Sequence, residues 1–76
     1  MELNEFVAKI AELFEEIDTT NFNGQTDFRN NEEWSSLIGL SVIAMIDEEY
    51  DVTLKGDDVK KAKTIEDLFN TVKSKL

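Results

Sequence analysis

The chain has 76 residues, of which 41% are apolar, and a formal net charge of -9 from 17 acidic and 8 basic residues. It has no cysteine and no histidine, which excludes disulfides, Ser-His-Asp and Cys-His catalytic sites and histidine-based metal sites. The length suits one domain over residues 1–76, and the acidic surface disfavours nucleic acid and anionic membranes while it attracts basic protein patches.

Apolar residues recur at spacings of three and four in the first segment, which predicts a helix over about residues 3–18. The stripe is formed by Leu3, Phe6, Val7, Ile10, Leu13, Phe14 and Ile17. A long loop rich in Thr, Asn, Gly and Asp follows over about residues 19–34. It exceeds the usual length of a connection, so we expect it to pack through its own aromatic side chains, Phe22, Phe28 and Trp34.

A second helix is predicted from Ser36 to Tyr50, with the hydroxyl of Ser35 as its N-cap. Its apolar residues do not form a single stripe when they are placed about 100° apart. One group is expected to face the core: Leu40, Ile43, Ile46 and Tyr50. A different face carries an apolar pair beside polar and acidic residues: Ile38, Met45, Ser41, Glu48 and Glu49. An exposed apolar pair ringed by acids indicates a contact site for another protein, unless a further element covers it.

Two more helices are expected after a turn at residues 51–56. The short one, over about residues 57–61, has Val59 as its only strong apolar anchor. The last one, over about residues 65–75, begins after Thr64, which can cap it together with Asp67. Its stripe is Ile65, Leu68, Phe69, Val72 and Leu76. The predicted fold class is all-α: a small irregular up-down bundle of three main helices plus one short helix, with a long first loop.

No catalytic or metal site is predicted. Residues 51–56 superficially resemble the start of an EF-hand, but Lys55 stands where calcium needs an oxygen, and Ala62 stands where a bidentate Glu is required. Carboxylates are plentiful, yet a general acid/base pair needs a pocket that shifts its pKa values, and a bundle this small has little room for one. We therefore expect a protein that is not an enzyme.

The second helix and its flanks resemble the acyl carrier protein family. That family has Asp-Ser-Leu at the start of its second helix, followed by an apolar helix that ends in an acid run and an aromatic residue. The corresponding segments here are Trp34-Ser35-Ser36-Leu37, an apolar run over 38–46, acids over 47–49 and then Tyr50. Residues 62–68 look like the family's entry into its last helix, so the resemblance covers nearly the whole chain.

The resemblance implies that Ser36 receives 4′-phosphopantetheine from coenzyme A through a phosphopantetheinyl transferase. The thiol of this arm would carry acyl groups as thioesters, so the absence of cysteine is no obstacle. A phosphodiester at a helix N-terminus is electrostatically favoured, and Ser35 can cap the helix in place of Ser36. The implied partners are the transferase and acyl-transferring or condensing enzymes with basic patches, which would contact Leu37, Ile38, Ser41, Met45, Glu48 and Glu49.

Three positions depart from the family's pattern. Ser35 replaces the Asp that is implied to assist the transferase reaction, and Ile38 and Ser41 stand where acids are usual. We therefore expect a specialised carrier in a lipid or polyketide-type pathway rather than in bulk fatty acid biosynthesis. Two alternatives stay open: a peptidyl carrier, which differs only in its loading enzyme, and a non-carrier acidic interaction module, which has no need of Ser36.

The sequence further predicts a cytoplasmic monomer. No run approaches the roughly 18 apolar residues of a membrane span, and the N-terminus lacks the basic start of a secretory signal. The absence of cysteine fits a reducing compartment, and a strong net charge favours a soluble, monomeric domain.

Overall fold

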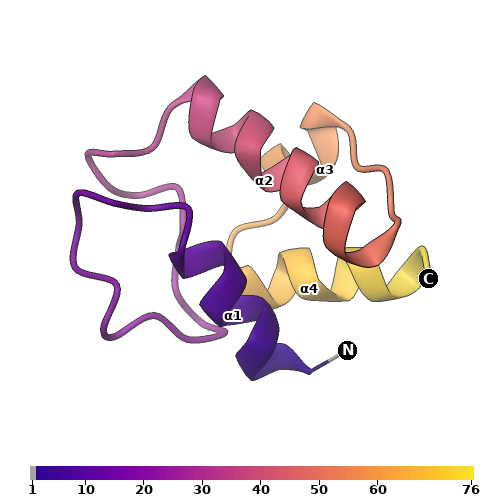
Figure 1. Cartoon of the computed structure of the whole chain (residues 1–76), viewed down its shortest axis with the longest axis horizontal. Helices are drawn as coiled ribbons and strands as arrows, with labels where there is room; N and C mark the ends of the chain where they lie inside the picture. Colours follow the sequence, from indigo (N-terminus) through magenta and orange to yellow (C-terminus); the bar gives the residue numbers. More distant parts are fainter. Residues whose placement is uncertain (1) are drawn as a thin grey trace.

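The computed structural model describes residues 2–76, and this part of the chain is helical, without strands. The helices are α1 (Leu3–Ala11), α2 (Ser36–Tyr50), α3 (Gly56–Lys61) and α4 (Ile65–Ser74). In Figure 1, α1 and α4 occupy the lower half of the view and α2 lies above them. α1 packs against α4, α2 against α3, and α3 against α4. The predicted all-α class, with three longer helices and a short one, is confirmed.

One apolar core draws on every helix. α1 contributes Phe6 and Ile10, α2 contributes Val42 and Ile46, and α3 contributes Val59. The face of α4 supplies Ile65, Leu68, Phe69 and Val72, and the turn between α2 and α3 adds Val52 and Leu54. The stripes predicted for the first and last helices therefore hold within the observed helices, except that Leu76 is 68% exposed. No helix within residues 2–76 combines the length and apolar character that crossing a bilayer requires.

The first helix is shorter than predicted, because it ends at Ala11 rather than near residue 18. The chain tightens there, with the N–H groups of Leu13 and Phe14 donating to carbonyls only three residues back. The next N–H groups, of residues 15–17, donate to the carboxylate of Glu33 at 2.8, 2.9 and 3.3 Å. Because this distant side chain takes the place of the helical carbonyl acceptors, the helix stops. Phe14 stays buried all the same.

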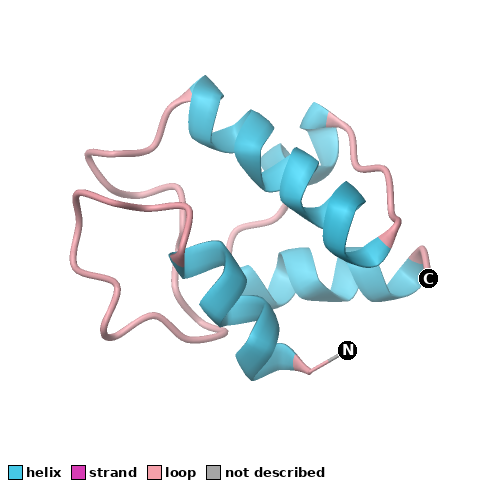
Figure 2. Cartoon of the chain, in the orientation of Figure 1, coloured by secondary structure: helices cyan, strands magenta, loops and turns pink. Residues whose placement is uncertain are grey.

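The connection between α1 and α2 therefore spans residues 12–35, and Figure 2 shows it as a broad loop at one end of the molecule. It is held by aromatic contacts, as predicted. The ring of Phe28 meets Trp34 edge-on at 5.5 Å, and Phe14 meets Phe22 at 5.6 Å. The loop also docks on the start of α4, where the carbonyls of Gly24 and Thr26 accept hydrogen bonds from residues 66 and 65. Long loops that pack on themselves in this way form part of the fold.

The bounds and caps of α2 and α4 agree with the sequence. The Ser35 hydroxyl accepts from the N–H of Ile38 at 3.4 Å, which makes Ser35 the N-cap of α2. Thr64 and Asp67 form the reciprocal capping pair of α4, with hydrogen bonds of 3.1 Å in both directions. The N–H groups of Thr64 and Lys63 both lower the pKa of the Asp67 carboxyl.

One prediction about the faces of α2 is wrong. Leu40, expected in the core, is 63% exposed, whereas Val42 is fully buried. The core meets α2 along Val42 and Ile46, which are four residues apart and so share a face. Ile43 and Tyr50 lie beside this face and are half-buried. Because α2 is apolar on several sides, its periodicity did not reveal which side the other helices would cover.

Candidate functional site

Ser36 is the first residue of α2 and is exposed. The preceding serine has an extended backbone and supplies the cap, so the hydroxyl of Ser36 is not committed to that role. Helix α2 carries no acidic residue in its first turn. A nucleophile or attachment point at this position therefore sits at the positive end of the helix dipole without a neighbouring side-chain anion on the same turn.

A pocket of about 430 Å³ opens beside Ser36, between α2, α3 and the end of the long loop. Its apolar wall consists of Trp34, Leu40, Ile43 and Val59. The remaining lining residues are small or polar: Ser35, Ser36, Gly39, Gly56, Arg29 and Lys60. The exposed side chain of Leu40 thus forms part of a pocket wall. We call this space the Ser36 pocket.

The Ser36 pocket contains two of the eight basic residues of the chain. Arg29 comes from the long loop, where its guanidinium lies 6.0 Å from the ring centroid of Phe28. Lys60 comes from α3 and is exposed. The pocket therefore combines an apolar wall with two cations, in a protein whose surface is otherwise dominated by carboxylates.

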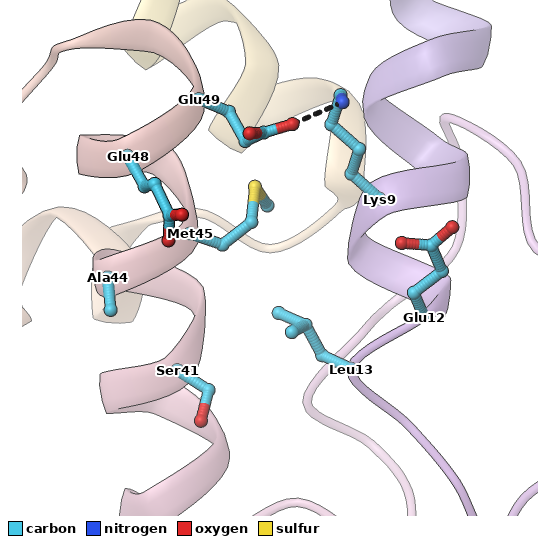
Figure 3. Close-up of a pocket in the computed structure, with 8 residues that line it drawn as sticks. All are labelled: Lys9, Glu12, Leu13, Ser41, Ala44, Met45, Glu48 and Glu49. Atoms are coloured by element: carbon cyan, nitrogen blue, oxygen red, sulfur yellow. Dashed lines mark hydrogen bonds and ion pairs between the residues drawn. The ribbon is translucent and has the colours of Figure 1, made fainter.

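A second groove, of about 380 Å³, lies between α1 and α2 (Figure 3). Helix α2 contributes Ser41, Ala44, Met45, Glu48 and Glu49, and the other side contributes Lys9, Glu12 and Leu13. Met45 and Leu13 point into the space from the two sides, and an ion pair of 2.6 Å joins Lys9 to Glu49 at one end. The hydrogen bond from Glu49 raises the pKa of Lys9. We call this space the acidic groove.

The acidic groove brings together four of the six residues predicted to contact partners, Ser41, Met45, Glu48 and Glu49. The other two lie elsewhere. Leu37 is 71% exposed next to Ser36, and Ile38 packs half-buried against the core. The expectation that Ile38 and Met45 form an exposed apolar pair is therefore wrong, because both side chains contact the core from the edge of the helix. The exposed large apolar residues of α2 are Leu37 and Leu40.

Sequence reasoning missed several residues of the Ser36 pocket, among them Arg29, Lys60 and Gly39. Arg29 carried a usable signal, since it is the only arginine of the chain and follows Phe28 in a loop that was expected to pack through its aromatic side chains. Lys60 carried none, because it stands in a run of lysines on a short helix. Its position in the pocket depends on how α3 packs against α2. Among residues 2–76, no group of three acidic side chains is arranged to hold a metal ion.

Comparison of the chain with protein families, curated proteins and solved structures finds no match. The resemblance to acyl carrier proteins therefore depends on the residues themselves and on the surroundings of Ser36.

Proposed function

We propose that this protein is an acyl carrier protein that holds acyl groups on 4′-phosphopantetheine attached to Ser36. The observation that supports the proposal is the free, exposed hydroxyl of Ser36 beside an apolar pocket, with Ser35 acting as the helix cap. If the role of Ser36 were only to cap the start of α2, neither the neighbouring Ser35 nor the pocket would be needed.

The residues around Ser36 fit such an arm. The arm supplies a thiol for thioester chemistry, which a chain without cysteine lacks. The exposed position of Ser36 leaves room for a transferase to reach its hydroxyl. Leu40, Ile43 and Val59 offer apolar surface along which an attached chain can be shielded from water.

The proposed partners bind the acidic side of α2. A phosphopantetheinyl transferase and acyl-transferring or condensing enzymes would present basic patches to Glu48 and Glu49, which are both exposed. Exposed Leu37 and Leu40 would add apolar contact next to Ser36. In this proposal the protein acts as a substrate of its partners and not as an enzyme, and it works as a monomer.

The proposal is tested by mass spectrometry after incubation with coenzyme A and several phosphopantetheinyl transferases. The wild type is expected to gain one phosphopantetheine group, and Ser36→Ala to gain none. Ser35→Ala is the matched control, because it removes the neighbouring hydroxyl and the cap but keeps the attachment point. A wild type that no transferase modifies would support the acidic interaction module instead.

The departure at Ser35 has its own test. Ser35→Asp restores the acid that the family resemblance implies for the transferase reaction, and Asp is as good an N-cap as Ser. We expect this variant to be modified faster than the wild type at unchanged thermal stability. Equal modification rates would show that the transferase does not read this position.

We further propose a specialised pathway. The first half of α2 carries neutral side chains, with Leu37 and Leu40 exposed and Ser41 half-buried, before its acids begin at Asp47. A housekeeping malonyl transferase that reads acids along the whole helix should load the holo-protein more slowly than it loads a housekeeping carrier. Equal rates would contradict this part of the proposal. Loading with amino acids by an adenylating enzyme would instead identify a peptidyl carrier.

A further inference from the structure

The two cations of the Ser36 pocket have no carboxylate partner within the part of the chain that the structure describes. Within residues 2–76, one ion pair with an N–O distance of 4.0 Å or less is found, between Lys9 and Glu49. It lies in the acidic groove, on the other side of α2 from the Ser36 pocket. Among the described residues Lys9 alone of the eight basic residues forms such a pair, so what distinguishes Arg29 and Lys60 is that these two cations line one pocket together.

Arg29 has a further unmet requirement. Its Nε atom is buried and makes no hydrogen bond within the described residues. Buried donors are normally paired with an acceptor, and an exception calls for an explanation such as an absent ligand. The Arg29 guanidinium cannot avoid the free-energy cost of an unpaired buried donor by losing a proton, because it is always charged in proteins. An acceptor with negative charge would satisfy both the donor and the charge.

We infer that Arg29 and Lys60 form an anion subsite that holds the phosphodiester of the arm on Ser36, an inference that rests on the proposed function. The same pocket is lined by Ser36, Arg29 and Lys60. A phosphate bonded to the Ser36 oxygen would therefore lie near both cations. The guanidinium offers several donors in a plane that suits phosphate oxygens, and the ammonium adds a compact charge. With the phosphodiester held there, Leu40 and Ile43 would be the apolar lining residues of α2 available to the rest of the arm.

The test compares apo- and holo-protein in the wild type and in three single variants. Arg29→Gln and Lys60→Gln each remove one cation of the subsite. Lys61→Gln is the matched control, because this neighbouring lysine of α3 is exposed and does not line the pocket. The readouts are the phosphorus resonance of the arm and the difference in melting temperature between the holo and apo forms, each measured at low and high salt.

We expect modification to raise the melting temperature of the wild type and of Lys61→Gln. The increase should shrink in the two subsite variants and, in the wild type, at high salt, because salt screens exposed charge pairs. The phosphorus resonance should move with the two subsite substitutions only. Equal holo–apo differences and unchanged phosphorus resonances in all four proteins would overturn the inference. If Arg29→Gln unfolds, Arg29→Lys and Lys60→Gln still test it.

A separate experiment distinguishes failure of this inference from failure of the proposed function. If no transferase modifies Ser36, the carrier proposal fails, and phosphoserine incorporated at position 36 becomes the probe. The second pKa of phosphoserine is about 6, and the subsite should lower it. This lowering should be smaller in Arg29→Gln and in Lys60→Gln than in Lys61→Gln. The same pKa in all variants would exclude the anion subsite whatever the function.

Discussion

Replacing Gly39 with alanine should stabilise the protein. Gly39 lies in the first turns of α2, where its N–H donates to the carbonyl of Ser35 at 3.0 Å, so the backbone is already helical. An added Cβ would stand 3.5 and 3.6 Å from two carbon atoms of the Trp34 ring, which is ordinary van der Waals contact. The methyl group would therefore pack without displacing the indole.

The expected gain follows from the lower conformational entropy that alanine has in the unfolded chain. Glycine within a helix is less favourable than alanine by roughly 0.5–1 kcal/mol. For a domain of this size, 1 kcal/mol shifts the melting temperature by about 4–8 °C, so Gly39→Ala should melt about 2–8 °C above the wild type. Because Gly39 also lines the Ser36 pocket, the methyl group narrows the space beside the proposed arm.

Thermal and urea denaturation followed by circular dichroism measure the effect, with Gly24→Ala as the matched control. Gly24 lies in the long loop, where an added Cβ would approach Leu3 to 3.1 Å and Glu66 to 3.5 Å. This crowding at the junction of the loop with α4 should leave Gly24→Ala less stable than Gly39→Ala. A Gly39→Ala protein that is no more stable than the wild type would contradict this prediction, because it would mean that Trp34 packs too closely on α2 to leave room for the methyl group.

Substitutions at three other positions test the caps and the loop. Asp51 has a left-handed backbone with φ of 55°, so Asp51→Gly should raise the free energy of unfolding by roughly 1 kcal/mol. Asp51→Asn removes the charge alone, so urea denaturation of both variants separates the effect of the backbone from the effect of the charge. Thr64→Ala should lower the free energy of unfolding by about 1 kcal/mol, because it removes the N-cap of α4, whereas Thr64→Ser should not. Backbone hydrogen bonds, first from residue 15 and then from residues 16 and 17, lower the pKa of the Glu33 carboxyl in the folded protein. The stability that this carboxylate contributes is therefore fully present above the usual glutamate pKa of about 4.3. It is lost as the pH falls through the lower pKa of the folded state. Glu33→Gln should therefore be least stable relative to the wild type at neutral pH, and the two melting temperatures should converge below about pH 4; a constant difference would contradict the role given to this carboxylate.

Local signals predicted the last helix and the bounds of α2, whereas a distant contact decided where α1 ends. Thr64 and Asp67 are three residues apart, so their reciprocal hydrogen bonds are visible in the sequence. The end of α1 depends on Glu33, which stands 16 to 18 residues from the N–H groups that it accepts. The apolar periodicity continues over residues 13–17, beyond the end of α1 at Ala11. Such a pattern indicates which side chains face the core, and it does not require that the backbone is helical.

The candidate site was predictable in part for the same reason. Ser36 and its capping neighbour were recognisable because an N-cap and the residue after it are adjacent in the chain. The pocket was not, because Arg29, Gly39 and Lys60 come from three separate segments. Their juxtaposition depends on the aromatic packing of the long loop and on the contact between α2 and α3.

In the proposed function, Ser35 and Ser36 have separate roles at the start of α2: Ser35 caps the helix, and Ser36 would carry the arm. If a single serine had to cap α2 and carry the arm, the bulky phosphodiester would occupy the oxygen that accepts the N–H of Ile38. With two serines, the cap at Ser35 stays in place whether or not Ser36 is modified. The fold is then expected to be the same before and after attachment, and the pocket beside Ser36 already exists in the unmodified protein, so an attached arm would meet preformed apolar and cationic surfaces.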